Sequence, residues 1–201
     1  MALIQTRGNA KIDSSVCTYS HTPMLTCPNC KECSGTCYAM KSYRQYPNVK
    51  KSWDSNFELS LYNPKTFVAT AIQELKASKK AYCRIHVAGD FYSVDYINAW
   101  IEIASALPYM VFWTYTKAGI NAAMRAALEK LNSLPNVNIV NSYPLGRINY
   151  GSLDYIQELA RELSAAGEKC FICPCGTDDN VKCGKSCHAC SVYKYVLFKQ
   201  H

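Results

Sequence analysis

From residue 63 onward, short apolar segments alternate with amphipathic segments of helical periodicity. The apolar runs at 82–87, 110–116, 137–140 and 169–173 predict strands. Helices are predicted to begin at Asn63-Pro64, at Ser93, near Ile120 and at Ser152, the last of them ending before Gly167. Strands separated by helices of about 12 residues form right-handed β-α-β units, which build a parallel sheet. This alternation therefore predicts an α/β fold.

The first 62 residues add less regular structure. A strand is predicted near 15–20 and a long helical stretch from about Cys37 to Tyr62. With 201 residues and 49% hydrophobic content, the chain can bury one sizeable core. We expect a single α/β domain over residues 1–201, with a parallel sheet and flanking helices, either open or a partial (β/α) barrel, and cysteine-rich metal-binding segments at both ends.

Ligands of such folds bind at the carboxyl ends of the strands. The residues predicted there are Gly89, Asp90, Phe91, Tyr115, Thr116, Lys117, Asn141, Ser142, Tyr143, Cys173 and Cys175. Lys117 could hold a phosphate or carboxylate, although a solvated lysine is the plainer interpretation. His86, at the end of its strand, is either a proton donor or ligand at the sheet mouth or a hydrogen-bonded core histidine.

Four of the twelve cysteines are closely spaced near the amino terminus, in the pattern Cys-x2-Cys-x2-Cys-x3-Cys. These are Cys27, Cys30, Cys33 and Cys37, here called the first cysteine group. The spacing matches bacterial ferredoxins, in which the first three thiolates hold one 4Fe-4S cluster and the fourth reaches another. The group therefore predicts three ligands to an iron-sulfur centre, with the fourth position open or filled from elsewhere, for instance by Cys17.

A second cysteine group lies near the carboxyl terminus. It consists of Cys170, Cys173, Cys175, Cys183, Cys187 and Cys190. We expect Cys183, Cys187 and Cys190, with Cys173 or Cys175, to hold a second centre. Zinc is the alternative, because Cys27/Cys30 and Cys187/Cys190 have zinc-ribbon spacing and His188 adds a nitrogen donor. Cys83 falls inside a predicted strand and fits a buried small hydrophobe.

The amino terminus has no signal-peptide pattern, and no run of about 18 apolar residues occurs. We therefore expect a cytosolic protein that does not bind membranes, and in such a compartment clustered thiols favour metal over disulfides. The net charge of +7 counts thiols as neutral, so thiolate-bound clusters would lower it. Bases interleaved with aromatics between Lys41 and Trp53 fit either a nucleic-acid surface or an amphipathic helix.

Several segments together resemble the phage gene product 88 family. They are 8–11, Cys27-x5-Cys33-x3-Cys37-Tyr38-Ala39, 84–93 and 112–117, of which 84–93 is the most specific. The resemblance covers most of the chain. It implies a phage or prophage origin and a location in the host cytosol, and it implies no particular reaction.

This family is sometimes regarded as related to radical S-adenosylmethionine proteins. That relationship implies that Cys27, Cys33 and Cys37 hold a 4Fe-4S cluster whose free iron binds S-adenosylmethionine. Gly89 and Asp90 would then orient the cofactor beside Tyr115, with Gly89 allowing close approach and Asp90 accepting from the ammonium. The plainer interpretation of Asp90 is a turn or helix-capping aspartate.

The sequence therefore leaves three functions open. The first is an iron-sulfur protein, with a radical S-adenosylmethionine-like enzyme acting on a small molecule or nucleic acid as its catalytic form. In that form the catalytic residues would be Asp90, His86 and Lys117, and an electron donor would be a partner. The second is a zinc-stabilised nucleic-acid-binding module, and the third is an electron-transfer or cluster-carrying protein without catalysis.

Overall fold

The computed structural model describes residues 2–9, 11–32, 34–119, 122–174 and 181–199. Its centre is a four-stranded parallel sheet formed by β1 (Val16–Thr18), β2 (Tyr82–Ile85), β3 (Val111–Thr116) and β4 (Val137–Asn141). The strands lie in chain order, so each strand pairs with its predecessor. Within the described residues β1 and β4 are the edges of this sheet, which is therefore open.

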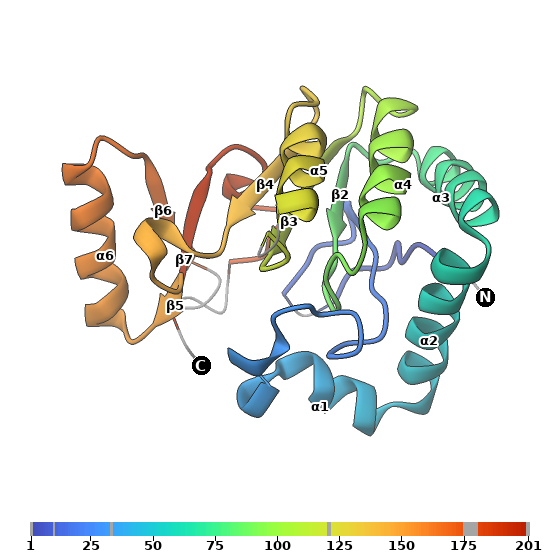
Figure 1. The fold of residues 1–201 in the computed structure, drawn as a ribbon, viewed down its shortest axis with the longest axis horizontal. Helices are drawn as coiled ribbons and strands as arrows, with labels where there is room; N and C mark the ends of the chain where they lie inside the picture. The colour runs from blue at the N-terminus through green and yellow to red at the C-terminus, as the bar shows by residue number, and fades with distance from the viewer. Residues whose placement is uncertain (1, 10, 33, 120–121, 175–180, 200–201) are drawn as a thin grey trace.

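Helices cover one face of the sheet, as Figure 1 shows. They are α3 (Pro64–Ser78), α4 (Val94–Ser105) and α5 (Ala122–Asn132). Local chemistry sets their starts: Pro64 occupies the first turn of α3, and the Ser93 hydroxyl accepts from the backbone N–H of Tyr96 (3.2 Å) to cap α4. Ile120 lies outside the described residues, so the predicted start of the third helix is not tested there.

The helix-side core is built on alternate strand residues. Cys83, Ile85, Phe112 and Val137 face the helices and pack with large aromatics from α3 and α4. Trp100, which is fully buried, contacts the rings of Tyr19, Phe67 and Phe112. This layer is the main apolar core of the described residues.

The opposite face of the sheet carries the remaining strand residues, including Val16, Trp113 and Val140. The segment 181–193 packs against it, and Cys190 belongs to the same buried cluster. We call this face the tail-side face. Asn138, on β4, fastens the segment by donating to the backbone carbonyls of Cys190 (2.8 Å) and Tyr193 (3.0 Å).

A smaller parallel sheet continues beyond β4. Its strands are β5 (Tyr150–Gly151), β7 (Tyr195–Lys199) and β6 (Cys170–Ile172), in that spatial order, with α6 (Leu153–Ala165) packed on them. The backbone N–H of Asn141 donates to the carbonyl of Lys194 (2.9 Å), which joins the two sheets. The sequence predicted β6 but neither β5 nor β7.

The helical stretch predicted over 37–62 forms two helices, α1 (Tyr38–Gln45) and α2 (Pro47–Tyr62). The break occurs because Pro47 disfavours helical backbone at Tyr46, whose φ of −119° and ψ of 102° are extended. Figure 1 shows α1 beneath the carboxyl ends of the central strands. The loop and helix after β1 are thereby brought to the predicted ligand-binding edge.

Candidate functional site at the carboxyl ends of the sheet

Asp90 lies where predicted, just beyond the end of β2, and it ties the ends of β2 and β3 together. It is 7% exposed. One carboxylate oxygen accepts from the Thr116 hydroxyl (2.6 Å) and the Phe91 N–H (2.7 Å), and the other accepts from the Lys117 N–H (2.9 Å). Burial raises the pKa of Asp90 to about 6 despite these three donors, which favour the charged form. Asp90 is thus a turn-forming carboxylate as well as a candidate ligand.

Only glycine fits at position 89, because the ring of His21 lies against it. His21 is not among the site residues predicted from the sequence. The φ of Gly89 is +85°, and a Cβ atom there would lie 2.0 Å from His21 Cδ2. His21 is fully buried, and its Nε2 lies 3.0 Å from the backbone oxygen of Asp90. Its position three residues after β1, at the carboxyl edge, is the signal by which His21 could have been found from the sequence.

His86 belongs to the helix-side core. Its φ of +61° ends β2 two residues before the predicted boundary at 87. Its ring stacks on that of His21 with centroids 4.8 Å apart, and its Nε2 lies 2.9 Å from the Tyr96 hydroxyl. Burial, followed by the nearby His21 and Arg84, holds the pKa of His86 well below its usual range. The arrangement is that of a neutral, hydrogen-bonded core histidine, and a catalytic role for it stays a prediction.

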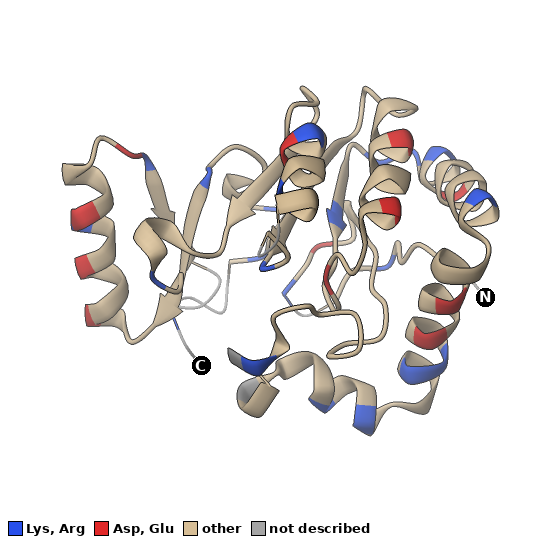
Figure 2. Ribbon diagram, in the orientation of Figure 1, with Lys and Arg blue, Asp and Glu red and all other residues tan. Residues whose placement is uncertain are grey.

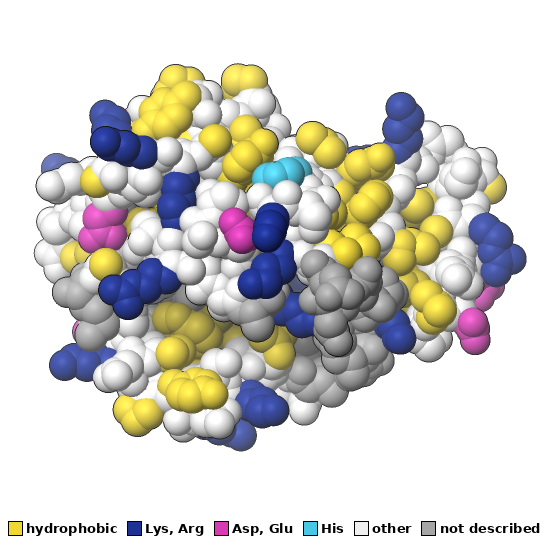
Figure 3. All heavy atoms as spheres, turned by 180° about the vertical axis from the view of Figure 1, so that it is seen from behind, with side chains coloured by type: hydrophobic (Ala, Val, Ile, Leu, Met, Phe, Trp, Pro, Cys, Tyr) yellow, Lys and Arg dark blue, Asp and Glu magenta, His cyan; other side chains and the backbone are white. Residues whose placement is uncertain are grey.

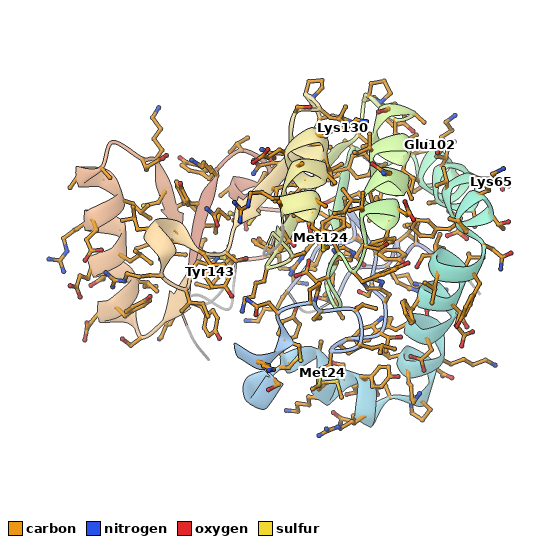
Figure 4. The ribbon with its side chains drawn as sticks, viewed as in Figure 1. Met24, Lys65, Glu102, Met124, Lys130 and Tyr143 are labelled. Carbon is orange, nitrogen blue, oxygen red and sulfur yellow. The ribbon has the colours of Figure 1, made fainter. Side chains whose placement is uncertain are left out.

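Lys117 lies just past the end of β3 and extends over two tyrosine rings. Its Nζ lies 5.9 Å from the centroid of the Tyr143 ring and 5.3 Å from that of Tyr150. Tyr143 follows β4, and Tyr150 begins β5. Figure 4 shows Tyr143 between the central sheet and the smaller one. Lys117 therefore sits at the junction of the two sheets.

Tyr115 lies on the tail-side face, two residues before Lys117. Its hydroxyl donates to the Cys190 sulfur at 2.5 Å. Its ring meets Phe198 edge-on, with centroids 5.2 Å apart. The residue proposed to contact a cofactor thus contacts the second cysteine group directly.

Arg84 is a further residue that sequence reasoning missed, since it was considered only as part of a family segment. Its guanidinium carbon lies 4.9 Å from the centroid of the Tyr115 ring. Burial alone would lower the pKa of Arg84, but four nearby acids raise it. These are the phenols of Tyr38 and Tyr115 and the thiols of Cys183 and Cys190. The strand alternation of Cys83 and Ile85 toward the helices could have placed Arg84 on the other face.

The first cysteine group lies at the same edge. Asn29, between Cys27 and Cys30, donates to the Tyr143 hydroxyl (3.0 Å), and the Tyr38 hydroxyl donates to the backbone oxygen of Val87. The thiols of Cys27, Cys30 and Cys37 are half-buried, and an open cavity of about 460 Å³ adjoins Cys37. Cys33 lies outside the described residues.

The second cysteine group is spread over the tail-side face and β6. Cys183 forms parallel bridges with Ile12, just before β1, and with Cys187. Cys173, at the end of β6, and Cys190 are buried in one apolar cluster. Cys175 lies outside the described residues.

Cys17 and Cys83 face each other across β1 and β2 in the helix-side core, both fully buried. Burial raises the pKa of Cys17 and places that of Cys83 well above its usual value. Their side chains lie on the helix side of the sheet, away from Arg84 and Cys190. This position suits small hydrophobes, the interpretation given for Cys83.

Among the described residues, no group of three or more His, Cys, Asp or Glu side chains could hold a metal ion. No disulfide joins any two of the ten described cysteines. The described side chains therefore do not converge on a metal site, and metal ligation by the two cysteine groups stays a prediction.

The bases and aromatics of 41–53 lie along α1 and α2, and Figure 2 shows the basic positions on these helices in blue. Lys50 pairs with Asp54 at 2.6 Å, and the Tyr43 hydroxyl donates to the same carboxylate. Tyr43 also stacks on Trp53, with ring centroids 6.2 Å apart. These side chains therefore contact one another within the two helices, as expected for amphipathic helices. No described helix is long and apolar enough to cross a membrane.

The fold and site together define an α/β protein with an open parallel sheet and chemically reactive side chains gathered at its carboxyl edge. Within that class, the chain belongs to the gene product 88 family, whose model matches residues 2–166. The match includes the first cysteine group and Arg84, Asp90 and Lys117, and it ends before Cys170. The resemblance to this family is thereby confirmed, whereas a relationship to radical S-adenosylmethionine proteins stays a prediction.

Two curated relatives are the Gene 88 proteins of mycobacterium phages D29 and L5. Each is 29% identical to this chain over 120 residues, which is 55% of this chain and 50% of the relative. The aligned part thus spans about half the length of these relatives. No solved structure matches the chain.

Proposed function

We propose that this protein binds an iron-sulfur cluster at the carboxyl edge of its sheet, through the first cysteine group. The observation that carries the proposal is the position of that group. Contacts from Asn29 to Tyr143 and from Tyr38 to Val87 bring it beside the ends of β2, β3 and β4, where ligands of parallel sheets bind.

The spacing of the cysteines supports iron over zinc. The pattern of Cys27, Cys30, Cys33 and Cys37 is that of bacterial ferredoxins, and it supplies these four residues as candidate holders of the cluster. Because metal sites often form only when the metal binds, the loop 27–37 would close around the cluster as it loads. A 4Fe-4S cluster supplies one-electron transfer when bound.

The finer proposal is a radical S-adenosylmethionine-like enzyme on a partial (β/α) barrel. The chain-ordered strands β1 to β4 support it, since such barrels place each strand beside its predecessor. In this form Asp90 would accept from the ammonium of the cofactor, in competition with the three donors that it already binds. Calorimetry with S-adenosylmethionine tests this form separately from cluster binding, and an absence of binding would leave an electron-transfer or cluster-carrying protein.

The test is metal and sulfide analysis of protein purified without oxygen. We expect a brown protein with stoichiometric iron and acid-labile sulfide. Cys27→Ala should remove the cluster of the first group and its share of the iron, because Cys27 is a ligand both in the ferredoxin-like set and in the radical S-adenosylmethionine-like set. Cys83→Ala is the matched control and should retain full iron, since its thiol lies in the helix-side core.

Two results would contradict the proposal. One is a colourless protein with stoichiometric zinc and no labile sulfide, which would indicate the zinc-stabilised module. The other is unchanged iron and sulfide in both Cys37→Ala and Cys27→Ala, which would place the metal elsewhere.

A further inference from the structure

A run of basic residues extends from the first cysteine group into α2. Residues 31–51 hold five Lys or Arg residues and one Glu, and so supply a net +4 of the chain's charge of +7. The helix α1 within this run has no acidic residue, and Figure 2 shows only basic charged positions along it. More than half of the net positive charge is therefore concentrated in one short segment.

Two of these cations line one cavity. The cavity of about 460 Å³ beside Cys37 is bordered by one face of α1, including Lys41 and Arg44, and by the turn that precedes the helix. Both cations are exposed. Like charges one turn apart on a helix repel each other, so an anion bound between these side chains would relieve the repulsion.

The structure separates the basic and aromatic side chains that serve the helices from those that do not. Tyr43 and Trp53 stack on each other, and Lys50 pairs with a carboxylate of α2. Among the described residues, Lys41 and Arg44 have neither a carboxylate nor an aromatic ring as a partner. Packing within an amphipathic helix pair therefore accounts for the first set and not for the second.

Tyr38 supplies an exposed ring that is already held in place. Its hydroxyl donates to the backbone oxygen of Val87, just beyond the end of β2, yet the residue is 63% exposed. A flat group that stacks on this ring therefore orders little further of the side chain. Tyr46, at the opposite end of α1, is 51% exposed. The helix thus carries two cations between two exposed aromatic rings.

Exposed rings interleaved with cations are typical of surfaces that bind single-stranded nucleic acids. The rings stack on bases, and the cations bind the phosphate backbone. In a duplex the faces of the bases are stacked on one another, so exposed rings favour a single strand. Figure 3 shows basic side chains beside hydrophobic ones, a class that includes tyrosine, on the lower part of the molecule, where α1 lies.

We propose that α1 and the cavity beside Cys37 form a binding surface for single-stranded nucleic acid. Lys41 and Arg44 bind its phosphates, and Tyr38 and Tyr46 stack on its bases. The proposal does not depend on which metal the cysteines bind, because none of these four side chains belongs to the cysteine groups.

Fluorescence anisotropy of a labelled single strand of about 12 nucleotides, within the span that single-strand-binding folds cover, tests the proposal. The full chain, purified without oxygen, is titrated into DNA and RNA strands and into a duplex of the same sequence. We expect a single strand to bind more tightly than the duplex at low salt, and the comparison of the two strands tells DNA from RNA.

The double variant Lys41→Gln/Arg44→Gln should weaken this binding by about 10-fold or more, the effect of losing charge-assisted hydrogen bonds. It should also reduce the slope of log K against log salt by about 1.4, because a single strand releases about 0.7 counterion for each phosphate that is neutralised. Lys65→Gln/Lys130→Gln is the matched control. It removes the same charge from α3 and α5, far from α1 in Figure 4, and should bind as the wild type does.

A second pair of variants tests stacking. Tyr38→Ala should weaken binding by about 5-fold or more with an unchanged salt slope, because it removes a ring and no charge. Tyr38→Phe keeps the ring and loses the bond to Val87, so it should bind as the wild type does. Tyr109→Ala is the control for an exposed tyrosine elsewhere, since Tyr109 is 56% exposed and lies between α4 and β3.

Three results would overturn the proposal. One is no binding of either single strand, and another is equal affinity in Lys41→Gln/Arg44→Gln and its control. The third is displacement of the strand by polyglutamate as readily as by the unlabelled strand, which would indicate a surface for acidic proteins. Iron content is expected to stay unchanged in Lys41→Gln/Arg44→Gln, so this proposal and the iron-sulfur proposal fail separately.

Discussion

The contact between Gly89 and His21 fixes the turn after β2 at the level of single atoms. With a φ of +85° and His21 Cδ2 only 2.0 Å from the place of a Cβ, this position excludes any side chain. The turn in turn positions Asp90, whose carboxylate joins the ends of β2 and β3.

We therefore expect Gly89→Ala to lower the free energy of unfolding by about 3 kcal/mol or more, because both backbone strain and a clash with a buried ring must be relieved. Urea denaturation measures the change. Gly35→Ala is the control, since nothing lies within 4 Å of its Cβ position, and it should change stability by less than about 1 kcal/mol. Equal effects of the two substitutions would contradict this account of the turn.

At this scale the positions of several site residues could be predicted from the sequence, and their roles stay predictions. Asp90, Tyr115 and Lys117 lie at the carboxyl edge as expected, because strand ends can be read from apolar periodicity. The stacking of His21 on His86 joins residues 65 positions apart, and periodicity does not report such contacts. The left-handed backbone conformation of His86 could not be predicted either, because the apolar pattern of residues 82–87 does not report backbone angles.

Among the elements, β4 holds the segment 181–193 through the side chain of Asn138. Asn138 donates to the carbonyls of Cys190 and Tyr193, and so holds the second cysteine group against the tail-side face.

Asn138→Asp should release this segment, since a carboxylate has the same shape but repels both carbonyls. We expect a loss of about 2–4 kcal/mol in stability and faster amide hydrogen exchange over 181–193. Asn48→Asp, exposed in the first turn of α2, should change neither, because a carboxylate there suits the helix dipole. Unaltered exchange in Asn138→Asp would mean that the other contacts of the segment, its bonds to residues 11–15 and its apolar packing, hold it without Asn138.

Elements with strong periodicity were predicted within one to three residues, including α3, α4, α6 and β1 to β4. β5 has only two residues, too few to show alternation. No strand is predicted for β7, although Tyr195, Val196 and Leu197 form a buried apolar run there. The stretch predicted as helical over 37–62 is helical except for a break at Tyr46, and Pro47 is the signal in the sequence for that break.

For the whole molecule, buried ionisable groups set how stability depends on pH. Burial lowers the pKa of His21 to about 3, although its hydrogen bond with the Asp90 backbone acts to raise that pKa. Burial also holds the pKa of His86 well below 6.5. As the pH falls below about 6.5, the unfolded chain protonates both histidines and the folded protein does not, so stability is lost. Asp90 opposes this, because its raised pKa lets the folded protein take up a proton first, between about 6 and 3.8.

Between pH 6 and pH 4 the unfolded chain takes up protons on two histidines and the folded protein takes up one on Asp90. These groups together therefore lower the free energy of unfolding by about 1.4 kcal/mol for each pH unit of acidification. His21→Gln, whose amide can still donate to the Asp90 carbonyl, should reduce the slope by about one proton. Urea titrations at several pH values measure it. A slope that is the same in the variant and the wild type would show that His21 does not stay neutral in the folded protein.

Residues 11–15 pair with the segment at 183–184 through backbone and hydroxyl bonds, one of which spans 169 positions of the chain. During synthesis on the ribosome, β1 to β4 emerge several seconds before that segment does, at about 5–20 residues per second. Trp113 and Val140 consequently face water in the nascent chain until residues 181–193 have emerged. A stop codon placed just before residue 181 should therefore yield a product that chaperones retain and proteases clear.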